Sequence, residues 1–217
     1  MKRSAEEMKT QFERDGFLVV PHLFSREEAQ AFKREIQRVV QEVRAEAVQN
    51  GQKPEEVISN GVYVGIAARS AIYQQAVADE RLLAVLTILL GTELEFLSDK
   101  VVFKDGEKDY GSPWHQDWPY WQGSHKLSVW VALDDATPEN GCMKFMPGSH
   151  HGLVAHDGES GDSMGFIHRL EPGSLDESKA VTAAIEAGGA AFFHDLALHS
   201  SYPNQARRDR WVWIPTY

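Results

Sequence analysis

Trp114-His115-Gln116-Asp117-Trp118 places an imidazole and a carboxylate two positions apart in the second half of the chain. In an extended strand, residues i and i+2 project from the same face, so His115 and Asp117 can both point at one ion. A further imidazole, His199, follows much later in the chain. Two histidines and one carboxylate on a β framework are the ligand set that binds non-haem Fe(II) and leaves coordination positions open.

Aromatic residues surround this pair. Trp114 precedes it, and Trp118, Tyr120 and Trp121 follow it. A carboxylate among indole rings is costly unless it meets a cation, which is the argument for a metal here; a solvated polar pair is the alternative. The aromatic residues after the pair are expected either to contact a substrate or to pack at the rim of the site.

Two histidines compete for the role of third ligand. His194 ends the apolar run 190–194, where a single histidine is more often structural. His199 is followed by small residues and by Asn204, a turn-like sequence that would leave it at a cavity mouth. Spacing alone gives His199 only a slight preference.

Charge and composition exclude several classes of partner. A net charge of −10 argues against nucleic acid and against an anionic membrane surface, since both attract clustered Lys and Arg. The single Cys142 cannot form an internal disulfide and suits a reducing compartment. No apolar run approaches the ~20 residues of a membrane span, and residues 1–14 lack the apolar core of a signal peptide. The chain is therefore predicted to be cytoplasmic.

The order of predicted elements favours an α+β fold. Helices are expected over 4–14, from the capping box that begins at Ser25 to Asn50-Gly51, and over 80–90, with a buried strand at 17–20 between the first two. Short β-like runs separated by turns follow, at 94–97, 100–104, 126–133, 143–146, 190–194 and 211–217. We predict one domain over 1–217, helical to about residue 92, with an antiparallel barrel or jelly roll over about 93–217. The polar connection at 154–179 is expected to be either a lid or a disordered surface loop.

Several motifs occur together in one order: His115-x-Asp117, Asn140-Gly141-Cys142, Pro147-Gly148-Ser149-His150, and His199-x-Ser201-x-x-Asn204 followed by Arg210. This pattern resembles the phytanoyl-CoA dioxygenase family of Fe(II)/2-oxoglutarate-dependent oxygenases, from about residue 12 to residue 217. The resemblance implies a double-stranded β-helix, the cupin-like jelly roll, supported by N-terminal helices. It also implies Fe(II), 2-oxoglutarate and O2 as cofactors and cosubstrates.

The resemblance assigns roles to individual residues. It selects His199 over His194 as the third iron ligand, beside His115 and Asp117. It selects Arg210 over Arg208 for binding 2-oxoglutarate, and it suggests Lys100 and Trp130 as further residues of that pocket. Trp130 has barrel core as its alternative. Arg210 begins an apolar last strand, where its guanidinium can pair bidentately with a carboxylate.

The implied activity is hydroxylation or a related oxidation of a C–H bond, because related halogenases have a small residue at the position of Asp117. A Zn(II)-dependent enzyme and a non-catalytic metal-binding barrel are the alternatives. The substrate is expected to be a small molecule, apolar or cyclic, lying over Trp118, Tyr120 and Trp121. A CoA thioester suits this acidic chain less well. The oligomeric state stays open. The chain stops at Tyr217, where the last strand should end, so either a trimmed chain or a barrel without further closing elements is expected.

Overall fold

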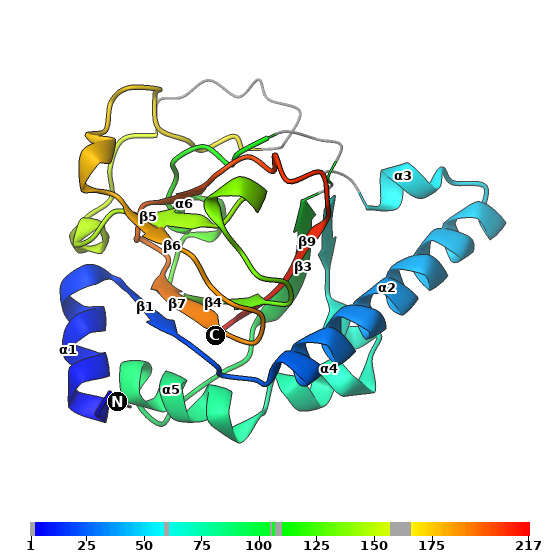
Figure 1. Ribbon diagram of the computed structural model, residues 1–217, viewed down its shortest axis with the longest axis horizontal. Coiled ribbons are helices and arrows are strands. Elements are labelled where there is room, and N and C mark those ends of the chain that lie inside the picture. The colour runs from blue at the N-terminus through cyan, green and yellow to red at the C-terminus, as the bar shows by residue number, and fades with distance from the viewer. Residues whose placement is uncertain (1–2, 59–60, 105, 107–109, 157–165) are drawn as a thin grey trace.

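The computed structural model of the chain describes residues 3–58, 61–104, 106, 110–156 and 166–217. Two antiparallel sheets form a barrel, with helices packed against the outer face of the larger sheet (Figure 1). This is the predicted α+β jelly roll with supporting helices. The larger sheet has the order β1 (Phe17–Val20), β7 (Ala190–His194), β4 (Leu127–Ala132), β9 (Arg210–Thr216), β3 (Ser98–Lys104) and β2 (Val62–Val64). The smaller sheet has the order β6 (Val181–Ala183), β5 (Met143–Phe145) and β8 (His199–Ser201).

Alternation along the strands of the larger sheet separates an inner from an outer face. In β9, Trp211 and Trp213 join the cluster formed with the helices, whereas Val212 and Ile214 join the cluster inside the barrel. Because side chains alternate along a strand, Arg210 shares the inner face with Val212 and Ile214. Thus a charged residue at the start of β9 points between the two sheets.

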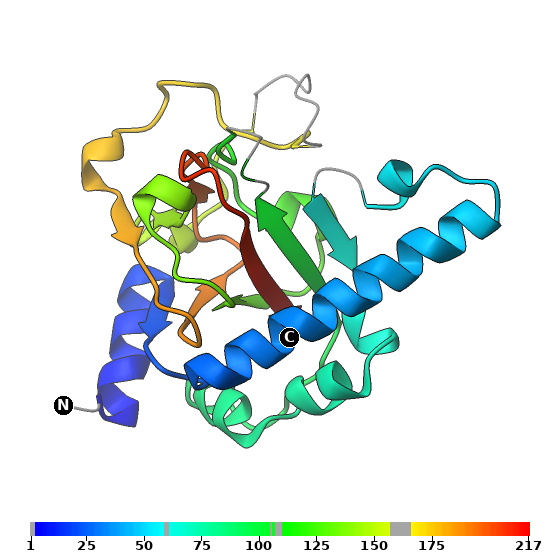
Figure 2. The ribbon, with the colours of Figure 1, turned by 45° about the vertical axis from the view of Figure 1, so that its right-hand side comes forward.

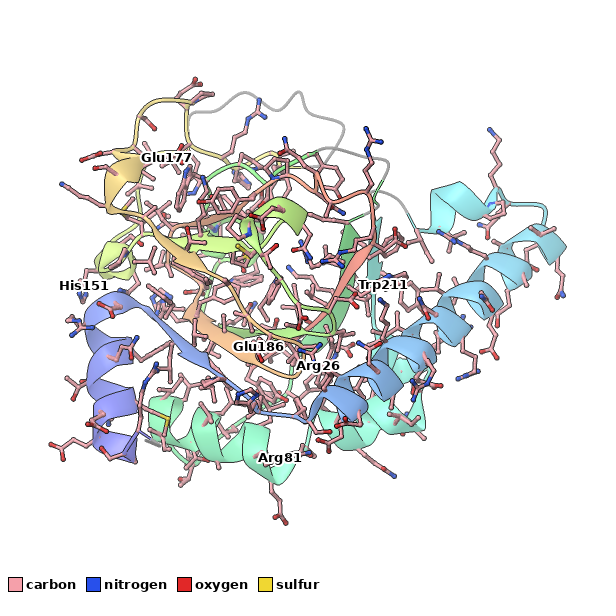
Figure 3. All side chains as sticks on the ribbon, in the orientation of Figure 1. Arg26, Arg81, His151, Glu177, Glu186 and Trp211 are labelled. Atoms are coloured by element: carbon pink, nitrogen blue, oxygen red, sulfur yellow. The ribbon has the colours of Figure 1, made fainter. Side chains whose placement is uncertain are left out.

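Helices cover the outer face of the larger sheet. In Figure 2 the long helix α2 crosses that face and extends beyond it. Its residues Ile36, Val39 and Val43 are buried, and Phe32 packs on Trp213 of β9 with ring centroids 6.0 Å apart. Arg81, labelled in Figure 3, ties a second helix to the start of α2 through an ion pair with Glu28 at 2.8 Å. The α-helices are α1 (Ala5–Asp15), α2 (Arg26–Gln49), α3 (Pro54–Val57), α4 (Ala71–Ala76), α5 (Glu80–Leu90) and α6 (Trp118–Trp121).

Local capping signals set the helix boundaries. Ser4 and Ser25 each cap a helix with a complete capping box, and Asp79 caps α5, which ends before Gly91. The helices expected from the sequence are thereby confirmed to within a residue or two. None of the helices among the described residues is long and apolar enough to cross a bilayer.

Three expectations require correction. Residues 94–97 form no strand, and the strand starts at Ser98. The three-residue strands β6 and β8 lie where no strand was predicted, and η5 (Glu177–Lys179) precedes β6. The large sheet also takes its edge strands β1 and β2 from the N-terminal region, so a boundary near residue 92 divides helices from strands only approximately. Short strands carry too few residues for a periodic pattern, and tertiary pairing decides them.

The connection at 154–179 is partly packed. Leu170 is buried against Trp114, Met146 and Leu198, and its backbone N–H donates to the Trp114 carbonyl at 2.9 Å. Residues 157–165 of this connection lie outside the described residues. Its described ends are thus anchored over the barrel beside His115 and His199 and are not a detached surface loop. The prediction of one domain over the whole chain stays a prediction.

Candidate active site

A cavity of about 170 Å³ lies inside the barrel. Inner-face residues of β3, β4, β8 and β9 line it together with residues of the segment 110–117, and the lining includes six of the residues singled out from the sequence. These are the three predicted metal ligands His115, Asp117 and His199, together with Lys100, Trp130 and Arg210.

The three predicted ligands converge in this cavity. His115 and His199 form an isolated antiparallel bridge, in which each backbone N–H donates to the other's carbonyl at 3.1 and 3.0 Å. Their Nε2 atoms lie 3.6 and 3.7 Å from Oδ1 of Asp117. All three side chains are buried. Such an arrangement leaves room for one ion held by two imidazoles and a carboxylate.

The hydrogen bonds of the two histidines fix their tautomers. Nδ1 of His115 contacts the Pro113 carbonyl at 2.9 Å, and Nδ1 of His199 contacts the Ala197 carbonyl at 2.9 Å. A carbonyl can only accept, so each Nδ1 carries a proton and donates it. Each Nε2 then presents its lone pair to the cavity, as a metal-ligating imidazole requires.

Electrostatics favour the same protonation states. Burial, helped by the neighbouring His115, lowers the pKa of His199 to about 3, so this imidazole is neutral at ordinary pH. Burial alone would raise the pKa of Asp117, but interactions with His199, Lys100 and His115 outweigh it and hold that pKa below its ordinary range. Asp117 is therefore ionised. The ionised Asp117 and the neutral His199 imidazole suit a divalent cation.

The geometry around Asp117 differs from the extended strand expected from His115-x-Asp117. Only His115 makes a β-bridge, and Asp117 has helical backbone angles (φ −76°, ψ −30°) directly before the short helix α6. The Asp117 N–H donates to the Asp195 carbonyl at 2.8 Å. The carboxylate therefore reaches the imidazoles through a turn, because Trp118-Pro119 starts a helix where a strand would continue.

Between the two ligands, Gln116 faces away from the metal site. Its Nε2 donates to the carbonyls of Gly152 and Leu196, and its Oε1 accepts from Val154 N–H at 3.0 Å. The amide is completely buried. It therefore holds the start of the 154–179 connection against the segment that leads to His199.

Arg210 is a buried cation at the other end of the cavity. Its Nη2 donates to the Gly141 carbonyl at 2.9 Å, and its guanidinium carbon lies 5.1 Å from the centre of the Trp130 ring. Its Nε and Nη1 are buried without a hydrogen-bond partner, and none of the described carboxylates pairs with it. Burial lowers the pKa of Arg210 to about 10. These unused donors fit the distal carboxylate of a keto acid. Arg208, by contrast, is exposed.

Glycine is required at position 141. Its φ of +94° is left-handed, and a Cβ there would come within 2.7 Å of the Lys104 side chain and 2.8 Å of the Tyr202 carbonyl. The Asn140-Gly141-Cys142 turn thus brings a bare backbone carbonyl to Arg210. The turn therefore has a physical role beside the other motifs: it provides a hydrogen-bond acceptor for Arg210.

Lys104 was missed by sequence reasoning. It is buried in the cavity, opposite Arg210 in the β3–β9 register. Its Nζ donates to the Tyr110 carbonyl and the Ser201 hydroxyl, each at 2.9 Å, and also to the Tyr202 carbonyl. The strand periodicity could have identified it. Lys100, Val102 and Lys104 are two positions apart along one strand, so a face that includes Lys100 also includes Lys104.

The predicted substrate aromatics lie outside the cavity lining. Trp121 donates from Nε1 to Asp195 Oδ2 at 3.1 Å, and Trp118 donates from Nε1 to the Gly123 carbonyl at 3.3 Å. Tyr120 approaches His115 edge-on, with ring centroids 6.3 Å apart. The aromatic ring that lines the cavity beside His115 is Phe166, at 4.7 Å. The helical turn of α6 carries Trp118 and Trp121 away from the site.

His194 and His125 lie in a separate cluster around Asp195. His194 and His125 both approach Oδ1 of Asp195, at 3.1 and 2.9 Å. Trp121 and the Lys126 backbone N–H also donate to this buried carboxylate. His150 is half-buried against Gly16, and burial lowers its pKa. His194 therefore belongs to a hydrogen-bonded cluster around Asp195 and not to the metal site.

Comparison with known proteins gives consistent similarities over almost the whole chain. Ectoine dioxygenase of Stutzerimonas stutzeri (strain A1501) is 28% identical over 218 residues, which cover 92% of this chain and 72% of that protein. L-proline trans-4-hydroxylase of Streptomyces griseoviridis is 26% identical, covering 96% and 84%. The crystal structure of EvdO2 from Micromonospora carbonacea var. aurantiaca, complexed with 2-oxoglutarate, shares the fold with a TM-score of 0.77 at 20% identity, covering 99% of this chain and 91% of that one.

Fold, site and similarities together define the class of this protein: it is a 2-oxoglutarate-dependent non-haem iron dioxygenase. Within that class, the chain belongs to the phytanoyl-CoA dioxygenase (PhyH) family, whose sequence profile matches residues 12–212.

Proposed function

We propose that this protein uses His115, Asp117 and His199 to hold Fe(II) and hydroxylates, or otherwise oxidises, a C–H bond of a small organic molecule. One observation carries the proposal: two Nε2 lone pairs and one carboxylate oxygen meet in a buried cavity that also contains the unpaired guanidinium of Arg210. Fe(II) with 2-oxoglutarate and O2 supplies the oxidising chemistry, in which 2-oxoglutarate yields succinate and CO2.

The protein's part is to bind and orient. Arg210 would pair with the distal carboxylate of 2-oxoglutarate while stacking on Trp130 and donating to Gly141. Lys100 would lie at the metal end of the same pocket, since its charge acts on both Asp117 and His199. Lys104 would fix the wall opposite Arg210 through Ser201 and the residue 202 carbonyl. Phe166 would keep water away from His115.

Small molecules are the substrate class that the relatives support. Their names give ectoine and L-proline as substrates. Both compounds are therefore the first to assay with this enzyme. The expectation of an apolar or cyclic substrate rested on Trp118, Tyr120 and Trp121, and all three side chains donate hydrogen bonds to other residues. A Zn(II) enzyme or a non-catalytic barrel is not favoured. Neither would bind a keto acid, so neither accounts for a buried Arg210 guanidinium without a carboxylate partner among the described residues.

The test uses anaerobic protein with Fe(II) and 2-oxoglutarate. The expected result is a weak metal-to-ligand charge-transfer absorption that appears only when both are present, and succinate on admission of air. Absence of the band together with absence of succinate would contradict the proposal. Zn(II) in place of Fe(II) is the control: it should occupy the ligands and give neither signal.

A further inference from the structure

The cavity holds more positive charge than iron and a keto acid can balance. Among its lining residues, Lys100, Lys104 and Arg210 are cations, and Asp117 is the one carboxylate among those described. His115 and His199 add no charge to this count, because an imidazole ligates a metal only through an unprotonated nitrogen. Fe(II) would add two positive charges and 2-oxoglutarate two negative ones. Counted over the described lining residues alone, the assembled centre would therefore keep a formal charge of plus two.

This excess comes from the two lysines. With Asp117 and Arg210 alone, the same assembly of iron and keto acid would be neutral. Charge enclosed in a protein is costly unless it is paired or hydrogen-bonded. Lys104 is hydrogen-bonded within the protein, so the ammonium group that is left to receive a further negative charge is that of Lys100, and the remaining ligand to enter the cavity is the substrate.

The two lysines differ in how far they are already engaged. The ammonium of Lys104 is fully buried and directs its donors at Tyr110, Ser201 and Tyr202. Lys100 is half-buried and makes no hydrogen bond or ion pair with any residue that the structure describes. An unengaged ammonium retains all three donors for a ligand.

Position along β3 places Lys100 at the reacting end of the cavity. In the β3–β9 register, Lys104 lies opposite Arg210. Lys100, four residues earlier in β3, lies opposite Ile214, four residues later in β9. The charge of Lys100 acts on both Asp117 and His199. Val62 of the neighbouring strand β2 and Phe166 line the same cavity and supply apolar wall.

We infer that the substrate is a small organic acid whose carboxylate pairs with Lys100 while its carbon skeleton contacts Val62 and Phe166. This inference rests on the proposed function, because it assumes that Arg210 is occupied by 2-oxoglutarate. It replaces the apolar substrate expected from the sequence with an acidic one. An ion pair at Lys100 also fixes the orientation of the substrate relative to the metal ligands.

The experiment compares acids with their amides on the anaerobic Fe(II) and 2-oxoglutarate complex, with 2-oxoglutarate saturating. Matched pairs are L-proline and L-prolinamide, benzoate and benzamide, and cyclohexanecarboxylate and its carboxamide. The expected result is a shift of the charge-transfer band with one or more acids and none with the matched amides. An amide that binds as tightly as its acid overturns the inference. So does a panel in which no acid shifts the band, or in which acids merely abolish it by displacing 2-oxoglutarate.

Variants locate the effect. Lys100→Gln should weaken binding of the responding acid by about tenfold or more, Lys100→Arg should retain most of it, and the 2-oxoglutarate titration should change less. Lys179→Gln, at a largely exposed lysine, is the matched control. Unchanged acid binding in Lys100→Gln, or a loss of 2-oxoglutarate binding alone, overturns the assignment. Failure of the proposed function is distinguishable, because the band would then be missing from the wild-type protein before any acid is added.

Discussion

The backbone carbonyl of Asp195 accepts hydrogen bonds from the N–H groups of Asp117 and Trp118, at 2.8 and 3.1 Å. Asp195 therefore holds a predicted metal ligand without contributing an atom to the cavity. Its own carboxylate is completely buried and is fixed by Trp121 Nε1 and the Lys126 N–H. A residue four positions before His199 in the chain thus positions the segment that contains His115 and Asp117.

Asp195→Asn should loosen this arrangement, because an amide has only one oxygen to accept the bonds that two carboxylate oxygens now receive. We expect Fe(II) affinity to fall by roughly 10–100-fold, the usual cost of losing support for a ligand. Anaerobic Fe(II) titration of the charge-transfer band measures this. Trp121→Phe, which removes one of these bonds, should give a smaller loss in the same direction. Full affinity in Asp195→Asn would show that the backbone alone suffices.

Asp117→Ala should abolish Fe(II) binding at this site, because it leaves two neutral imidazoles without a charged ligand. The measurement is iron content after anaerobic loading and desalting. Asp176→Ala, at a surface carboxylate, serves as the control and should retain iron. Stoichiometric iron in Asp117→Ala would mean that the metal lies elsewhere.

Arg210→Met should have opposite effects on stability and on cosubstrate binding. The ligand-free protein should become more stable, by about 1–4 kcal/mol, since a buried unpaired cation is replaced by an apolar side chain of similar length. Affinity for 2-oxoglutarate should fall by about 2–5 kcal/mol, while iron still binds. Thermal unfolding and a 2-oxoglutarate titration measure the two.

The matched control is Arg208→Met, two residues earlier and exposed. It should change neither quantity much. If the Arg208 variant lost 2-oxoglutarate binding and the Arg210 variant did not, the assignment of the keto-acid pocket would be wrong.

Cys142 offers a pH-dependent probe. Burial raises the pKa of this thiol from its ordinary value near 9 to about 11. Its contribution to stability is therefore present below pH 9 and is lost as the pH rises towards 11, because the unfolded chain ionises first. Chemical denaturation at pH 7 to 11 measures this. Cys142→Ala should lose less stability over that interval than the wild type, and equal losses would contradict the assignment.

The sequence predicts what depends on local chemistry. Ser25 and Asp79 cap their helices as expected, because a capping side chain needs only its own first turn. The apolar strand that starts at Arg210 made a position inside the barrel possible, and the resemblance to a family selected this residue. The resemblance to a family selected His199 over His194 as the predicted ligand; in the structure His194 lies beside Asp195, and His199 forms a β-bridge with His115.

Other features depend on contacts between distant segments. Nothing near Trp121 in the sequence indicates that its indole bonds to Asp195, so the ring was assigned to the substrate. The helical backbone angles at Asp117 depend on the same distant residue, whose backbone carbonyl accepts from the Asp117 N–H. Strand β8 exists because His199, Ser200 and Ser201 pair with β5, and three polar residues give no β pattern alone.

The pairing of β1 with β7, which sets Phe17 opposite Phe193, has a consequence for how the molecule is made. A nascent chain emerging from the ribosome can form α1 and α2 early, but β1 has no neighbour until nearly all of the chain has been synthesised. The high contact order of this pairing, and of β3 with β9, predicts slow closure. The predicted metal site likewise cannot form before His199 has been synthesised, although His115 and Asp117 come much earlier in the chain. Iron loading should thus follow barrel closure, and a truncated translation product would lack a complete set of ligands.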